Sequence, residues 1–169
     1  ALGNEFTNPD DENAIPPVFN ALAKKLIVKG RDIASLGSGQ LVSALVEQSE
    51  LHIVVIEANA DLVAAARKRL DEKGLYGQRV AIIEGAPMEL PLAPYMADLV
   101  VSEELPGLLE KPVDSTRAVF KLLRPFTGMA CLPGDDGALK KAFASNKLHG
   151  CEIESVGDLL VVRKTSAPA

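Results

Sequence analysis

Two glycines and one acidic residue have the spacing of a nucleotide-binding turn. Gly37 and Gly39 follow a short expected strand at 31–36 and precede a segment with helical periodicity at 40–48. A glycine turn between a strand and a helix lets the backbone approach a ligand closely, and the free N–H groups of the helix start favour its anionic or polar end. Glu57 stands about 20 positions after Gly37, where a carboxylate accepts hydrogen bonds from both hydroxyls of a ribose. These residues predict a nucleoside-binding site.

The elements that must position this site alternate between strands and helices. Strands are expected at 31–36, 51–57, 79–84, 98–102 and 128–132, and helices at 18–29, 40–48, 59–73, 114–123 and 138–147. Such repeats demand a mainly parallel sheet with right-handed crossovers. Residues 151–156 and 159–163 then form an antiparallel hairpin around Gly157 and Asp158. We predict an α/β three-layer sandwich with a seven-stranded sheet of order 3-2-1-4-5-7-6, the last strand antiparallel, and helices on both faces.

Several side chains have predicted positions within these elements. The β-branched run 51–57 is typical of a parallel strand buried on both faces. Asn59 is expected to cap the following helix, which should turn Leu62, Ala66 and Leu70 toward the core. Cys131 and Cys151 are expected to be buried small apolar residues, because their spacing fits neither a metal site nor a disulfide framework.

Composition excludes several classes of function. The net charge is -5 with no long basic run, and only 4% of residues are aromatic, so nucleic acid is not an expected partner. The two histidines, His52 and His149, lie far apart without ligand-like neighbours, and no metal is predicted. No segment approaches the roughly 20 consecutive apolar residues of a membrane span, so no membrane association is expected. The expected location is the cytoplasm.

The length of 169 residues fits one domain covering 1–169. Residues 1–16 form a polar, proline-punctuated arm, and 165–169 form a tail or linker. A Pro-Ala tail of this kind suits a fusion to other domains.

At four places the sequence resembles the class I S-adenosylmethionine-dependent methyltransferases, which have a Rossmann-like fold. The matching segments are 33–39, 54–57, 97–102 and 122–128. The resemblance implies that S-adenosylmethionine is the cofactor, with its methionine part cradled by the glycine turn, its ribose held by the acid, and its adenine covered by the loop at 85–88. The implied cofactor-binding residues are Ser35, Gly37, Ser38, Gly39, Glu57, Ala58, Ala86, Pro87 and Ser102.

Three positions depart from the family pattern. Ser35 replaces an acid two residues before the first glycine, Leu41 replaces a third glycine, and Ala86 replaces the acid that bonds the adenine amino group. Each lost polar contact typically costs about 0.5 to 1.5 kcal/mol. Two outcomes follow: either Leu41 leaves the turn open and the cofactor binds, or its side chain fills the methionine pocket.

The predicted function is a methyltransferase with an unknown small-molecule or protein acceptor. The acceptor should dock at the carboxyl ends of the strands, where the acids Glu103, Glu104, Asp135 and Asp136 form either a rim for a cationic acceptor or a solvated surface. No catalytic residue is expected to be recognisable, because methyl transfer depends mainly on orientation. The alternatives are a degenerate, non-catalytic binding or structural module and an NAD-type dinucleotide-binding domain; Val42 stands where the dinucleotide fingerprint wants a small residue.

Overall fold

The computed structural model describes residues 32–36, 39–86, 89–102, 106–134 and 137–167, and the expected helix 18–29 lies outside them. The strands are β1 (Asp32–Leu36), β2 (His52–Glu57), β3 (Val80–Glu84), β4 (Leu99–Ser102), β5 (Met129–Pro133), β6 (Cys151–Val156) and β7 (Leu159–Lys164). The helices are α2 (Gly39–Gln48), α3 (Ala60–Glu72), α4 (Pro106–Leu109), α5 (Pro112–Leu122) and α6 (Ala138–Ser145). Helix α4 was not expected, and α5 begins two residues early because a proline is well tolerated in the first helical turn.

All seven described strands join one sheet in the order β3-β2-β1-β4-β5-β7-β6. Strands β1 to β5 pair in parallel with their neighbours. Strand β7 runs antiparallel to both β5 and β6, as the terminal hairpin predicts. The prediction of an α/β, Rossmann-like architecture is therefore confirmed, and β1 lies centrally with β2 and β4 on either side.

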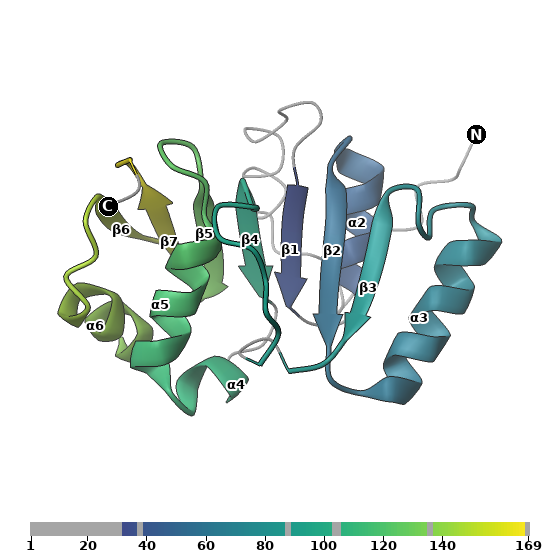
Figure 1. Ribbon diagram of the computed structural model, residues 1–169, viewed down its shortest axis with the longest axis horizontal. Coiled ribbons are helices and arrows are strands. Elements are labelled where there is room, and N and C mark those ends of the chain that lie inside the picture. Colours follow the sequence, from purple (N-terminus) through teal and green to yellow (C-terminus); the bar gives the residue numbers. More distant parts are fainter. Residues whose placement is uncertain (1–31, 37–38, 87–88, 103–105, 135–136, 168–169) are drawn as a thin grey trace.

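Helices cover both faces of the sheet (Figure 1). In that view α2 lies behind the sheet, and α5 and α6 lie in front of it. One buried apolar cluster joins α2 and α3 to β2 and β3 and includes Leu45, Ile53 and Val63. A second cluster joins α5 and α6 to the other face and includes Leu123 and Phe143. The two cores give the three layers of the sandwich.

The inner stripe of α3 differs from the prediction in one residue. Asn59 caps the helix as expected, since its side chain accepts hydrogen bonds from the backbone N–H groups of the second and third residues after it. Leu62, however, is 53% exposed, and Val63 is 1% exposed. The inner stripe consists of the buried Val63 and Leu70 with the partly buried Ala66 between them, spaced three and four residues apart, so Leu62 lies at the rim of the contact.

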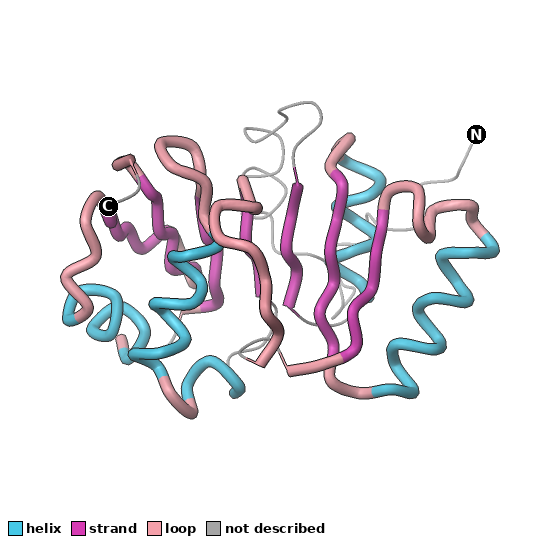
Figure 2. The backbone as a smooth tube through the Cα atoms, viewed as in Figure 1, coloured by secondary structure: helices cyan, strands magenta, loops and turns pink. Residues whose placement is uncertain are grey.

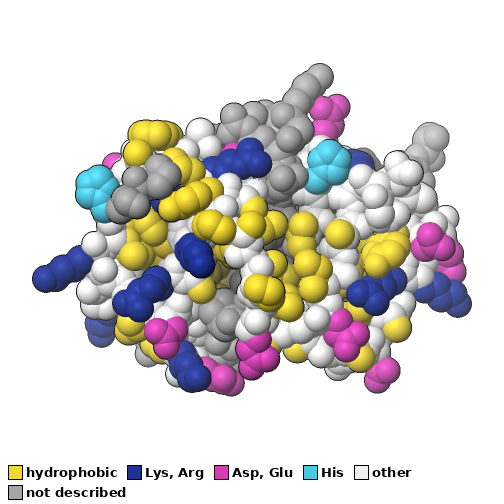
Figure 3. All heavy atoms as spheres, in the orientation of Figure 1, with side chains coloured by type: hydrophobic (Ala, Val, Ile, Leu, Met, Phe, Trp, Pro, Cys, Tyr) yellow, Lys and Arg dark blue, Asp and Glu magenta, His cyan; other side chains and the backbone are white. Residues whose placement is uncertain are grey.

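Strand β2 is buried on one face and only in part on the other, which corrects the prediction from its β-branched run in part. Ile53 and Val55 are buried on one face, whereas the other face carries the partly buried Val54 and the buried Ile56. On β3 the same face carries the exposed Ala81. Both α2 and α3 pack against the opposite face, and Figure 2 shows no described helix in front of β2 and β3. Figure 3 shows hydrophobic side chains at the surface in the middle of this face.

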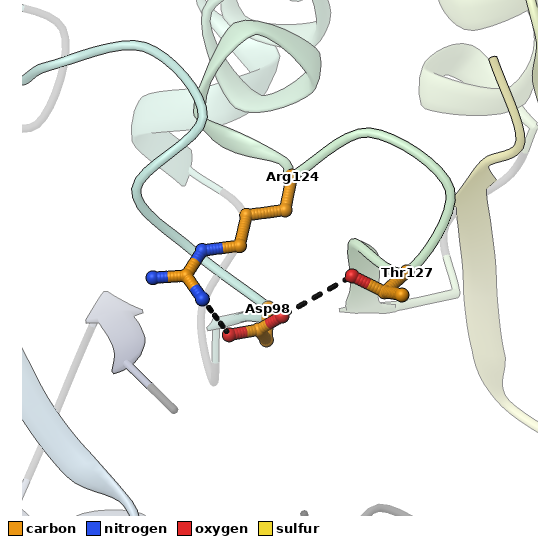
Figure 4. Close-up of polar contacts among 3 residues, drawn as sticks. All are labelled: Asp98, Arg124 and Thr127. Carbon is orange, nitrogen blue, oxygen red and sulfur yellow. Dashed lines mark hydrogen bonds and ion pairs between the residues drawn. The ribbon is translucent and has the colours of Figure 1, made fainter. Parts of the chain in front are cut away.

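A polar cluster fixes the edge of the sheet where β4 and β5 begin (Figure 4). Asp98 is 7% exposed and forms an ion pair with Arg124, with 3.0 Å between Oδ2 and Nη1. Its other oxygen accepts a hydrogen bond from the Thr127 hydroxyl at 3.2 Å. Gly128 follows in the same turn, and a Cβ there would lie 2.5 Å from the backbone nitrogen of Arg124. The turn after α5 therefore has no room for a side chain at this point.

The two cysteines should differ from ordinary thiols in reactivity. Cys131 is fully buried in β5, and burial raises its pKa to about 12. Cys151 is only partly buried, which corrects the expectation, and burial raises its pKa to about 11. Because the thiolate is the reactive form, a disulfide reagent at pH 8 is expected to leave Cys131 unmodified and to modify Cys151 slowly in the native protein. Rapid modification of both thiols without denaturant would contradict this burial.

Lys164 ends β7 with its side chain inside the protein. The residue is 5% exposed, and its Nζ donates a hydrogen bond to the backbone oxygen of Phe120 at 3.2 Å. The same nitrogen lies 4.5 Å from the ring centroids of Tyr95 and Phe120. Burial lowers the pKa of Lys164 below its usual 10.5. The rings and the carbonyl attract the ammonium, and desolvation acts against it.

This lowered pKa predicts a pH-dependent stability. Between the folded pKa and 10.5 the unfolded chain holds the Lys164 proton more tightly, so the free energy of unfolding should rise as the pH rises through that interval. Urea unfolding of the protein and of Lys164→Met, from pH 7 to pH 10, should show the unsubstituted protein gaining stability relative to the variant. Parallel pH profiles of the two proteins would show that Lys164 keeps an ordinary pKa.

Candidate cofactor site

The structure brings the described site residues to one edge of the sheet, the carboxyl ends of the parallel strands. Register pairs Leu36 with both Ile56 and Ser102, and Glu57 with Glu84, so the ends of four strands are level. Of the predicted residues, Ser35 lies in β1, Gly39 starts α2, Glu57 ends β2, Ala58 and Ala86 follow β2 and β3, and Ser102 ends β4. Gly37, Ser38, Pro87 and the acids Glu103, Glu104, Asp135 and Asp136 lie outside the described residues.

Glu57 is held in place by the start of the next helix. Its Oε1 accepts a hydrogen bond from the backbone N–H of Asn59 at 2.8 Å, and Asn59 is the cap of α3. The backbone oxygen of Glu57 accepts from the N–H of Gly85 at 3.0 Å, which ties the ends of β2 and β3 together. No further hydrogen bond of this carboxylate is found within the described ranges. Its second oxygen therefore has the capacity to accept from a ligand.

A cavity of about 220 Å³ lies beside Glu57, between α2 and α3 and above β2 and β3. Its walls are largely apolar and include Val42, Val55, Val63 and Ile82. The charged residues at its margin are Glu57, Arg69, Glu72 and Lys73. Apolar walls with few polar groups are typical of small-molecule sites. The cavity extends from the candidate ribose acid along the inner side of α3.

The three positions that depart from the family pattern lie in or beside elements of the described structure. Leu41 is 2% exposed and packs in the core cluster between α2 and the sheet. Ala86 is the second residue after β3, and its methyl group can accept no hydrogen bond. Ser35 occupies the fourth position of β1, opposite Val55 and Val101.

One acidic residue at this edge was not among the predicted site residues. Glu84 is the last residue of β3 and the register partner of Glu57, and it is exposed. Its signal in the sequence was positional, because both residues end strands that were expected to be adjacent and parallel. This acid stands two residues before Ala86, the position at which the family pattern has an acid.

A family model described as a methyltransferase domain matches residues 33–126, more than half of the chain. The chain belongs to this methyltransferase family. The matched segment runs from β1 through α5 and therefore includes every described residue of the candidate cofactor site.

Solved structures of S-adenosylmethionine-dependent methyltransferases share the fold of this methyltransferase. A protein assigned to that class from Methanococcus maripaludis superposes with a TM-score of 0.72 at 18% identity, covering 90% of this chain and 87% of that one. A methyltransferase from Aquifex aeolicus gives a TM-score of 0.66 at 15% identity, with 92% of each chain covered. Phosphoethanolamine N-methyltransferase 2 from Haemonchus contortus, solved with S-adenosylhomocysteine, gives 0.68 at 15% identity, covering 90% of this chain and 41% of that one.

Sequence comparison with curated proteins finds no match. The degenerate module and the dinucleotide-binding domain receive no support from the family model or from these structures. The described helices include none with the length and apolarity needed to cross a bilayer. Among the described residues, no three His, Cys, Asp or Glu side chains are grouped closely enough to hold a metal ion.

Proposed function

We propose that this methyltransferase domain binds S-adenosylmethionine at the carboxyl edge of β1, β2 and β3. The observation that supports it most is the position of Glu57, at the end of β2 and oriented by the N–H of Asn59. With one oxygen anchored, the carboxylate is pre-oriented to accept from the ribose hydroxyls. The start of α2, beside the end of β1, supplies backbone N–H groups for the carboxylate of the methionine part.

The residues of the site fit this cofactor. Leu41 is committed to the core, which favours the outcome in which the turn before α2 remains open. The bound cofactor supplies a methyl group on a sulfonium, which a nucleophilic acceptor takes with loss of S-adenosylhomocysteine. The contribution of the protein is to hold the cofactor so that this methyl group faces the acceptor side, near the ends of β4 and β5, and to align the acceptor with it.

The acceptor is proposed to carry an amine or another cationic group. Four acids follow β4 and β5 in the sequence, Glu103 and Glu104 directly after β4 and Asp135 and Asp136 after Gly134 beyond β5. Strands β4 and β5 are adjacent and parallel, so the segments that leave their carboxyl ends start side by side. A negative rim attracts cationic molecules. Transfer of labelled methyl groups to amine acceptors, with carboxylate acceptors as the comparison, tests this class; exclusive labelling of carboxylates would contradict it.

The cofactor proposal is tested by calorimetric titration of the folded domain with S-adenosylmethionine, S-adenosylhomocysteine and, as a control, NAD. Micromolar binding of the first two is expected, which corresponds to about -8 kcal/mol. Binding should also raise the melting temperature as ligand concentration increases. If millimolar S-adenosylmethionine gives neither heat nor a thermal shift, the isolated domain does not bind this cofactor.

A further inference from the structure

We propose that the groove between α2 and α3 binds the aliphatic chain of a carboxylate ligand, with the carboxylate held by Arg69 and Lys73. This site is additional to the proposed cofactor contacts, which lie at the ends of the strands, and it does not depend on them. Three observations support it: an apolar cavity, a half-exposed leucine that continues its lining, and two cations at one of its ends.

The cavity is much larger than an ordinary packing void. Its volume is about 220 Å³, and its floor is formed by the buried Val55 of β2 and Ile82 of β3. Protein interiors leave few voids larger than a water molecule, whose share of liquid volume is roughly 30 Å³. Water gains little in an apolar space, because the walls offer few hydrogen-bond partners. The groove is therefore suited to an apolar occupant.

One side of α3 forms the long wall of the groove. Leu62, Ala66, Arg69 and Lys73 all line the cavity and are spaced four, three and four residues apart, which places them along one side of the helix. From Leu62 to Lys73 this stripe is about 16 Å long, because an α-helix rises about 1.5 Å per residue. A single exposed leucine is ordinary, but Leu62 extends the apolar lining to the surface. The wall has the length and apolarity for an extended aliphatic chain.

The charges at the margin differ between the two ends of the groove. Helix α3 begins beside the end of β2 and runs back along the sheet, so Glu57 lies at one end and Lys73 at the other (Figure 1). Arg69 and Lys73 are about one helical turn apart, and neither side chain has an ion pair or a hydrogen-bond partner among the described residues. Glu72 adds one acid there, which leaves that end cationic. A carboxylate is attracted to this end and repelled by Glu57, so charge orients the ligand.

Chain length and head-group charge are tested by calorimetric titration of the 169-residue chain with hexanoate, octanoate and decanoate, below the concentrations at which they form micelles. The affinity is expected to rise about fourfold for each added methylene, because each one is removed from water in the groove. Decylammonium carries the opposite charge on the same chain and is expected to bind about tenfold more weakly than decanoate.

Two matched sets of variants locate the site on α3. Ala65→Phe places a ring in the groove and is expected to abolish decanoate binding, whereas Ala64→Phe changes the neighbouring exposed alanine, which does not line the cavity, and should leave binding unchanged. The double variant Arg69→Gln with Lys73→Gln should lower the decanoate affinity about tenfold and remove the preference over decylammonium. Lys68→Gln removes an exposed cation outside the groove and is expected to do neither.

Several results would overturn this assignment. Absence of decanoate binding, an affinity independent of chain length, or equal binding of decylammonium would each show that the groove does not select an aliphatic carboxylate. Equal loss of binding in Ala64→Phe and Ala65→Phe would place the effect in the folding of α3, and the melting temperatures of both unliganded variants check this directly. If analytical ultracentrifugation finds a dimer that Ala65→Phe dissociates, the groove is an interface between copies of this chain instead.

Discussion

Glu57→Ala is expected to lower the affinity for S-adenosylhomocysteine by about 100-fold or more. Hydrogen bonds to a charged group contribute about 1.5–3 kcal/mol each, and the variant loses the acceptor of the ribose hydroxyls. Alanine at position 57 has no side-chain oxygen that could accept these hydrogen bonds at the end of β2. Calorimetric titration at fixed salt and pH measures the loss directly.

A second variant distinguishes ligand binding from local folding. Glu57→Gln keeps an oxygen that can accept from the N–H of Asn59, so the cap region of α3 should stay intact while the charge is lost. An intermediate affinity is expected for this variant, with a melting temperature close to that of the unsubstituted protein. An unchanged affinity in Glu57→Ala would show that the ribose is held elsewhere.

Asp98→Ala is expected to lower the free energy of unfolding by about 1–3 kcal/mol. The buried carboxylate joins Arg124 and Thr127 at the edge where β4 and β5 begin, and its removal takes one acceptor from each of these side chains. The loss is smaller than for a fully buried pair, because the Arg124 side chain is 39% exposed and can turn to water. Urea unfolding followed by circular dichroism measures the change.

A double-mutant cycle separates the ion pair from the rest of this effect. Arg124→Leu removes this ion pair from the buried Asp98 carboxylate, and it should be destabilising by itself. The double variant is expected to lose less than the sum of the two single changes, because the pair is lost only once. Additive losses would show that the ion pair between Asp98 and Arg124 contributes no coupling energy. S-adenosylhomocysteine affinity should be retained in all three variants, since the cluster lies at the opposite edge from Glu57.

The sequence by itself determined the architecture and most of the candidate site. Alternating apolar runs, the glycines after the first of them and the terminal Gly157-Asp158 turn specify parallel βα units closed by a hairpin, because strand and helix periodicities and turn chemistry are local properties. The spacing from the glycine turn to Glu57 follows from the length of one βα unit. Asn59 was identified as a helix cap for the same local reason.

The tertiary structure decided what depends on contacts between distant segments. Whether Leu62 or Val63 is buried depends on the rotation of α3 about its axis against β2 and β3. Both residues are apolar and adjacent in the chain, so the sequence pattern does not distinguish the two rotations. The partial exposure of one face of β2 follows from the placement of α2 and α3 on the same side of the sheet. Glu84 joins Glu57 only through the register of β2 against β3, a relation between residues far apart in the chain. Periodicity fixes which face of an element is apolar, but only packing fixes which neighbour that face meets.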